Sequence, residues 1–122
     1  MSKKILVVED TEDNRQILRD LLGMAGYEMV EAHDGAQGVA MAAEHKPDLI
    51  LMDIQMPVLD GYEATRRIKA DPALAAIPIV AVTSYALSGD EAKARAAGCN
   101  DYIAKPYSPR QMLAKVREIL GE

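Results

Sequence analysis

The chain has 122 residues, of which 49% are hydrophobic and 27% charged, and these values indicate one compact domain with a real core rather than a disordered chain. The formal net charge of -5 makes direct binding to nucleic acid unfavourable, because an acidic surface repels phosphate backbones. Cys99 is the single cysteine, and the apolar run near the N-terminus is too short for a signal peptide or a membrane span, so we expect no disulfide, no membrane insertion and a reducing, cytoplasmic location.

Apolar runs of strand length alternate with windows of helical periodicity, which is typical of an α/β domain. Strands are predicted at 5–8, 28–32, 49–53, 79–83 and 102–104. The runs are apolar without strict alternation, as in parallel strands that are covered on both faces. Right-handed crossovers would arrange the five strand–helix units as an open, doubly wound, flavodoxin-like (βα)5 sheet with strand order 2-1-3-4-5.

Each predicted strand is followed by a predicted helix. The first helix ends at Gly26, the second ends before Pro47 and the third reaches Asp71. The first has apolar positions at Ile17, Leu18, Leu21, Leu22 and Ala25, and the last, which starts at Ser108-Pro109, has them at Met112, Leu113, Val116, Ile119 and Leu120. The fourth opens with an S-x-x-E capping box at Ser88 and offers only alanines for packing, so we expect it to be the loosest helix.

Polar residues suited to phosphate chemistry follow four of the strands. They are Glu9 and Asp10, Asp53, Thr83, and Lys105. In a sheet of this order, ligands bind outside the carboxyl ends of the strands, so we expect these side chains to gather at one edge. Carboxylates in one crevice repel one another, and a hard divalent cation, with Mg²⁺ as the natural candidate, would relieve that repulsion.

Asp53 is the candidate nucleophile of this cluster. Once a cation neutralises the incoming group, its carboxylate can attack an electrophilic phosphorus, as in aspartyl-phosphate chemistry. Thr83 can hydrogen-bond one phosphoryl oxygen and Lys105 can pair with another. A lone aspartate at a strand end is usually only a solvated terminus or a helix cap, and the register with the other acids and the lysine favours the functional interpretation.

The motifs, in this order, resemble those of the receiver domain of two-component response regulators, and the resemblance covers the whole chain, 1–122. It rests on the acid pair Glu9-Asp10, on Asp53-Ile-Gln-Met-Pro followed by Gly61, on Thr83 and on Lys105-Pro106. The resemblance implies that Asp53 accepts a phosphoryl group from a histidine kinase or a histidine phosphotransfer protein. The chain would then bind a downstream protein target, and it would catalyse only its own phosphorylation and dephosphorylation.

The resemblance also implies a metal site. Asp10, Asp53 and the main-chain carbonyl of Gln55 would bind Mg²⁺, and Glu9 would assist directly or through a water molecule. No other cofactor is implied. Asp53 would thus be both a metal ligand and the phosphoryl acceptor.

Three further residues acquire switch roles from the resemblance. Thr83 would be the switch hydroxyl, Tyr102 the rotating aromatic residue of the last strand, and Lys105 the phosphate-pairing lysine before a cis peptide bond to Pro106. The signal would leave through the face formed by the fourth helix, the last strand and the last helix. Candidate contacts on that face are Lys93, Arg95, Tyr102 and Tyr107. Tyr85 could slow the hydrolysis of the phosphoryl group, whereas Ser84 is small enough to leave access to Asp53.

Three alternatives stay open from the residues alone. The chain could be a receiver segment of a hybrid kinase or a larger regulator. A Mg²⁺ phosphohydrolase with an aspartyl-phosphate intermediate would place a second acid two residues after the nucleophile, where this chain has Gln55. A flavodoxin-like nucleotide binder would need a loop rich in backbone N–H donors, whereas residues 9–13 are strongly anionic.

Overall fold

The computed structural model describes residues 3–56, 58–83 and 90–122. Its five strands form one parallel sheet with the order 2-1-3-4-5, which confirms the predicted topology. The strands are β1 (Lys4–Val8), β2 (Glu28–Ala32), β3 (Leu49–Asp53), β4 (Ile79–Thr83) and β5 (Asp101–Ala104). The helices between and after them are α1 (Glu12–Met24), α2 (Gly35–His45), α3 (Gly61–Ala70), α4 (Asp90–Ala97) and α5 (Pro109–Leu120).

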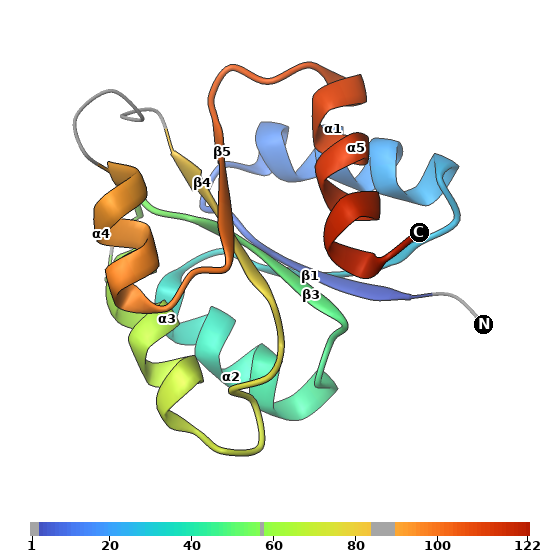
Figure 1. Cartoon of the computed structure of the whole chain (residues 1–122). Coiled ribbons are helices and arrows are strands. Elements are labelled where there is room, and N and C mark those ends of the chain that lie inside the picture. Colours follow the sequence, from blue (N-terminus) through green and yellow to red (C-terminus); the bar gives the residue numbers. More distant parts are fainter. Residues whose placement is uncertain (1–2, 57, 84–89) are drawn as a thin grey trace.

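The helices cover both faces of the sheet. Helices α1 and α5 lie on one face, and α2, α3 and α4 lie on the other (Figure 1). Successive strand residues therefore enter different cores: Leu6 belongs to the cluster under α2–α4, and Val7 belongs to the cluster under α1 and α5. This two-sided burial is the reason why the strand sequences are apolar without alternation.

Only some of the apolar residues that predict helix α1 are buried in the structure. Leu18 and Leu22 are buried against the sheet, and Gly26, with a φ of 88°, makes the turn that follows the helix. Ile17, one of the positions that predict this helix, is instead 55% exposed. The i, i+4 pair Leu18 and Leu22 faces the sheet directly, so the neighbouring position lies at the flank of the helix.

Helices α4 and α5 flank the edge strand β5 and pack in different ways. In α5, the predicted start is confirmed by a capping box between Ser108 and Gln111, and Met112 is fully buried. The buried side chains that the structure describes in α4 are Ala94 and Ala97. The predicted capping box at Ser88, like Ser84 and Tyr85, lies outside the described residues. Whether α4 is the loosest helix stays a prediction.

Candidate functional site

Three carboxylates meet at the carboxyl ends of β1 and β3. Glu9 directly follows β1 and Asp53 ends β3, and these strands are neighbours in the sheet. One carboxylate oxygen from each of Glu9, Asp10 and Asp53 lies within 4.8 Å of the others. Glu9 is 4% exposed and Asp53 is 3% exposed, whereas Asp10 is open to solvent. The result is a crevice with two buried acids below one exposed acid.

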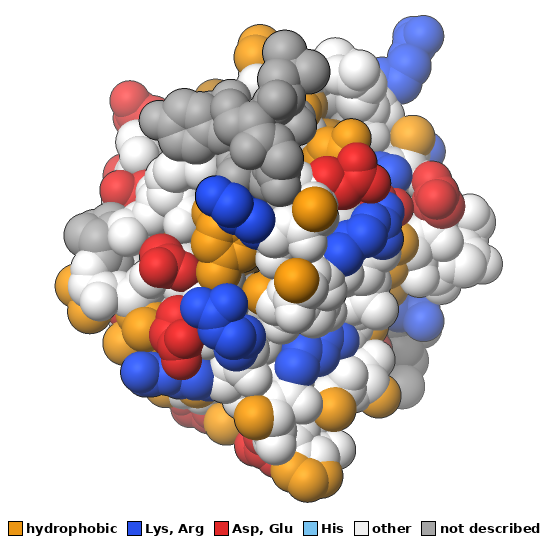
Figure 2. Space-filling view, turned by 60° about the vertical axis from the view of Figure 1, so that its left-hand side comes forward, with side chains coloured by type: hydrophobic (Ala, Val, Ile, Leu, Met, Phe, Trp, Pro, Cys, Tyr) orange, Lys and Arg blue, Asp and Glu red, His pale blue; other side chains and the backbone are white. Residues whose placement is uncertain are grey.

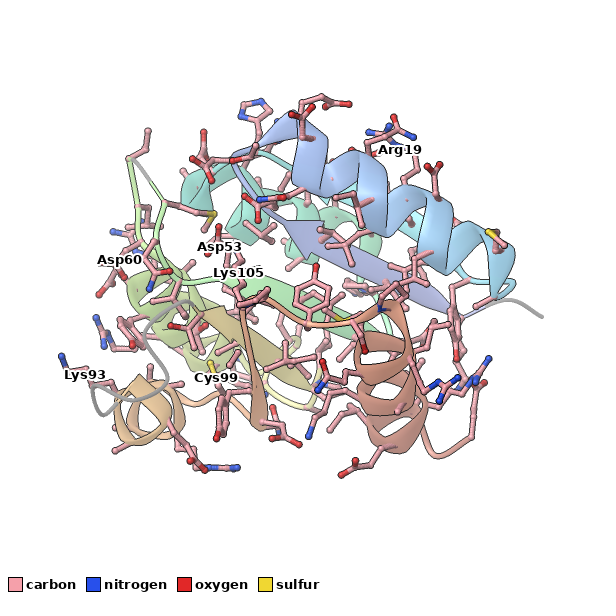
Figure 3. The ribbon with its side chains drawn as sticks, turned by 90° about the horizontal axis from the view of Figure 1, so that it is seen from above. Arg19, Asp53, Asp60, Lys93, Cys99 and Lys105 are labelled. Carbon is pink, nitrogen blue, oxygen red and sulfur yellow. The ribbon has the colours of Figure 1, made fainter. Side chains whose placement is uncertain are left out.

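Lys105 reaches this crevice from the connection after β5. Its Nζ lies 3.2 Å from Oε1 of Glu9 and 3.4 Å from Oδ2 of Asp53. Figure 3 shows Lys105 and Asp53 side by side. The peptide bond between Lys105 and Pro106 is cis, as the resemblance implied. Lys105 thus lies beside Glu9 and Asp53, as predicted, although it is far from both in the sequence.

The titration of the two buried acids reflects this crowding. Burial, followed by the charge of Glu9, raises the pKa of Asp53 to about 7, although Lys105 acts in the opposite direction. Burial alone would raise the pKa of Glu9 too, but hydrogen bonds, the largest from the Thr11 amide, and the charge of Lys105 leave it below its ordinary value. The positive charge of Lys105 therefore does not balance the negative charges of both Glu9 and Asp53.

These acids fit a divalent cation. Although Asp10 is exposed, its partial desolvation, followed by its interaction with Glu9, also raises its pKa, so the site resists a third negative charge. Hard cations such as Mg²⁺ take carboxylate, carbonyl and water oxygens, and this cluster offers three carboxylates. Glu9, Asp10 and Asp53 are the residues whose charges such an ion would balance.

Gln55 connects the acid crevice with the end of β4. Its main-chain N–H donates to Oδ1 of Asp53 at 3.2 Å, and its side-chain Nε2 donates to Oγ1 of Thr83 at 3.3 Å. Thr83 is 1% exposed. The sequence analysis considered the Gln55 carbonyl as a metal ligand and its amide as the replacement for a second acid, but it missed the link from the side chain to Thr83. The position of Gln55 two residues after Asp53 was the available signal.

Gly61 lets the start of α3 pack against the end of β3. A Cβ atom at this position would overlap the main-chain oxygen of Asp53 and the Cα of Ile54. The amide of Gly61 also donates to the carbonyl of Ile54 at 3.1 Å. The close approach therefore requires a glycine and fixes the loop that carries Asp53 and Gln55.

Helix α1 supplies contacts to the acid pair that the sequence analysis missed. Oε2 of Glu9 accepts a hydrogen bond from the Thr11 amide at 3.0 Å, and Oε1 accepts one from Asn14 at 3.4 Å. Arg15 donates to the main-chain carbonyl of Glu9 at 2.7 Å. A helical period places Asn14 and Arg15 on the turn nearest the strand end, which is the signal that could have found them.

The four residues predicted to contact a downstream partner, Lys93, Arg95, Tyr102 and Tyr107, lie in α4, in β5 and in the connection after β5. Lys93 and Arg95 belong to α4, on the side of the molecule where Lys and Arg side chains gather (Figure 2). Arg95 lies 3.6 Å from Asp101, which also pairs with Lys115 of α5 at 2.9 Å. Asp101 therefore joins both helices that flank β5.

The two tyrosines of this region face different cores. Tyr102 packs against the cluster under α2–α4, whereas Tyr107 packs against the cluster under α1 and α5. Tyr107 also lines a small cavity beside Glu9 and Asp53, and burial raises its pKa. The structure thus places Tyr102 on the α4 side of the sheet and Tyr107 next to the acid crevice.

An open hollow adjoins the crevice. It has a volume of about 540 Å³ and is lined by Asn14, Ile17, Lys105, Pro106 and Tyr107. The exposed Ile17 side chain gives this hollow an apolar wall.

In the parts of the chain that the structure describes, no helix has the length and apolar character needed to cross a membrane.

Known proteins resemble this chain in sequence. The sequence profile of the response regulator receiver domain matches residues 5–117. The polar-differentiation response regulator DivK of Brucella anthropi is 43% identical over 122 residues, covering 100% of this chain and 99% of that protein. The chain matches over nearly the full length of this relative.

Solved structures agree in fold. The receiver domain of the sensor histidine kinase PA1611 from Pseudomonas aeruginosa, described with a magnesium ion coordinated in the active site cleft, matches with a TM-score of 0.93, 38% identity and 100% coverage of both chains. The chemotaxis response regulator CheY4 of Vibrio cholerae matches with a TM-score of 0.92 and 28% identity over 98% of this chain and 99% of that one. With its strand order and its matched profile, the chain belongs to the response regulator receiver domain family and is a phosphorylation-dependent switch of two-component signalling.

Proposed function

We propose that Asp53 is the residue that is phosphorylated, within a single receiver domain that spans residues 1–122. The observation that carries this proposal is the burial of Asp53, at 3% exposure, within 3.4 Å of the Lys105 ammonium. A carboxylate oxygen of Asp53 would attack the phosphorus of a phosphohistidine. A new O–P bond forms while the P–N bond breaks, and the imidazole takes the electron pair of that bond.

Asp10, Asp53 and the main-chain carbonyl of Gln55 would hold Mg²⁺, with Glu9 assisting directly or through water. The bound ion would supply positive charge against the incoming phosphoryl group. It would also favour the ionised form of Asp53, whose pKa stands at about 7 without it. The magnesium ion in the PA1611 receiver supports this assignment.

Lys105 and Thr83 would receive the phosphoryl group. Lys105 would exchange part of its pairing with Asp53 for a charge-assisted hydrogen bond to a phosphoryl oxygen. Thr83 would turn its hydroxyl from the Gln55 side chain toward another phosphoryl oxygen. This chemistry is self-modification, and the amide of Gln55, in place of a second acid, makes turnover of other phosphate esters a poorer candidate function.

The proposed donor is a histidine kinase or a histidine phosphotransfer protein. The hollow lined by Ile17 and Tyr107 opens beside Lys105, so it could seat an apolar surface of that donor next to Asp53. A downstream protein would read the face that holds Lys93, Arg95 and Tyr102 after Tyr102 rotates. A cytoplasmic location is part of this proposal, and the buried free thiol of Cys99 is suited to a reducing compartment.

Intact mass after incubation with acetyl phosphate and Mg²⁺ tests the acceptor. The wild type should gain one phosphoryl group, and Asp53→Asn should gain none. Asp60→Asn is the matched control, because Asp60 lies at the end of the loop that follows Asp53 and caps α3 by accepting a hydrogen bond from the Glu63 amide at 2.9 Å (Figure 3). Modification of Asp53→Asn at the wild-type level would refute the assignment. Continuous phosphate release, rather than a single modification, would favour the phosphohydrolase.

A further inference from the structure

Arg15 lies between the acid pair and the edge strand β2, and its guanidinium is held on three sides. Nη1 donates to the carbonyl of Glu9 at 2.7 Å. Nη2 pairs with Glu12 at 2.7 Å, and Nε lies 3.4 Å from a carboxylate oxygen of Glu31 on β2. The Arg15 side chain is only 13% exposed. Its planar fork thus spans α1, β2 and the end of β1 at once.

The main chain of Glu9 is fixed on both sides. Its amide donates to the carbonyl of Ala32 on β2 at 3.0 Å, and its carbonyl accepts from Arg15. The peptide group between Glu9 and Asp10 is planar, so a fixed Glu9 carbonyl also fixes the direction in which the chain enters Asp10. The place of the exposed Asp10 carboxylate above the two buried acids therefore depends on this hydrogen bond.

We infer that Arg15 is a positioning residue that orients the Glu9-Asp10 pair for a divalent cation. The inference rests on the proposed function, because it takes the acid cluster as the cation site. Groups that hydrogen-bond to metal-binding residues orient them, and their loss typically weakens metal affinity by about 10- to 100-fold. Lysine would keep the charge of Arg15 but not the planar fork, so it cannot serve the carbonyl and both carboxylates together.

Arg19 provides a matched control on the same helix. It pairs with the same two carboxylates, Glu12 and Glu31, and Glu9 is not among its partners in the described structure. Figure 3 shows Arg19 along α1, away from Asp53. Replacement of either arginine by lysine disturbs the ion pairs between α1 and β2, but only Arg15→Lys disturbs the Glu9 carbonyl.

Magnesium binding should be measured on ion-free wild type, Arg15→Lys and Arg19→Lys by the shift of the Asp10 backbone amide during titration with MgCl₂. We expect the dissociation constant to rise about 10-fold in Arg15→Lys and to stay within about twofold in Arg19→Lys. Before any ion is added, the Asp10 amide should already be displaced in Arg15→Lys and unchanged in Arg19→Lys. Thermal unfolding without Mg²⁺ reports the structural cost of each change.

Several outcomes would overturn the inference. Wild-type affinity in Arg15→Lys, or an equal loss in both variants, would make Arg15 only one more ion pair. Loss of the folded state in both Arg15→Lys and Arg15→Gln would assign Arg15 to folding instead of the site. If the wild type itself bound no Mg²⁺, the proposed metal site would fail together with the inference, and this result is distinguishable from the others.

Discussion

The two sides of the functional site are built differently. At the ends of β1 and β3, Glu9 and Asp53 are backed by the core under α1 and α5, which contains the fully buried Met112. At the end of β4, Thr83 is equally buried, but the described buried side chains of the following helix, α4, are alanines such as Ala94. Among the described residues, α5 thus contributes large apolar side chains to its core, whereas α4 contributes small ones.

This difference separates chemistry from signalling. Burial stabilises in proportion to apolar area, so we expect moving α4 to cost less than moving α5. Phosphoryl transfer needs acids at fixed positions, whereas a switch needs an element that can move at low cost. Under the proposed function, the acid side would carry out the reaction and the α4 side would give the response.

The largest effect on stability should come from the acid side and should depend on pH. The pKa of Asp53 is raised from 3.8 to about 7, so its neutral form stabilises the fold, and this stability is lost as pH rises from about 4 through about 7. Over this pH range in ion-free buffer, the free energy of unfolding of the wild type should therefore fall by about 4 kcal/mol more than that of Asp53→Asn. Urea unfolding across this range measures the difference. Parallel pH curves for the two proteins would contradict it, and Asp60→Asn should follow the wild type.

Core substitutions in the two helices should differ in cost. Met112→Ala removes a fully buried side chain from α5 and should cost about 2 to 5 kcal/mol. Ala94→Gly removes one methyl group from α4 and should cost about 1 kcal/mol, mainly through helix propensity. Chemical denaturation of each variant gives both values. Equal costs would remove the distinction between a firmly packed and a loosely packed helix.

A smaller stabilisation is expected for Asp10→Asn without a cation. Partial desolvation and the neighbouring charge of Glu9 raise the pKa of Asp10, so its negative charge is unfavourable in the folded state. Because Asp10 is exposed, the gain at pH 7 should be below about 1 kcal/mol. The same variant should bind Mg²⁺ more weakly. A loss of stability in ion-free buffer would show that the three acids do not repel as described.

The smallest effect is expected on the rate of phosphorylation of Thr83→Ala. Asp53 and the acid cluster remain in this variant, so acetyl phosphate should modify it within about twofold of the wild-type rate. The response of the α4 side should nevertheless be lost. Backbone amide shifts on addition of beryllofluoride, a phosphoryl mimic, should spread through residues 90–107 in the wild type only. Equal shifts in the variant would remove the switch role of Thr83.

The sequence was sufficient to predict which side chains gather at the carboxyl ends of the strands. Parallel strands bring their carboxyl ends to one edge, so Asp53, Thr83 and Lys105 could be placed near one another from the apolar runs alone. The contacts of Arg15 depend on how α1 is rotated over the sheet, and a one-dimensional pattern does not contain that rotation. Tyr107 depends in the same way on the path of the connection after β5.

The apolar pattern of α1 shows the same limit. Leu18 and Ile17 are adjacent and equally apolar, yet one is buried and the other is 55% exposed. Periodicity predicts that a helix forms and roughly which face is buried, but the width of that face is set by the neighbouring elements. The same holds for Gln55, because the contact between its side chain and Thr83 depends on the pairing of β3 with β4.

Asp101 gives the edge of the sheet a sensitivity to ionic strength. Its carboxylate lies 3.6 Å from Arg95, whose side chain is 50% exposed, and it also pairs with Lys115. Dissolved salt screens such exposed charges but leaves apolar packing in place, so α4 loses part of its attachment while α5 keeps the packing of Met112. Added sodium chloride should thus weaken the contact of Arg95 in α4 with Asp101, whereas the apolar packing of Met112 in α5 does not depend on charge.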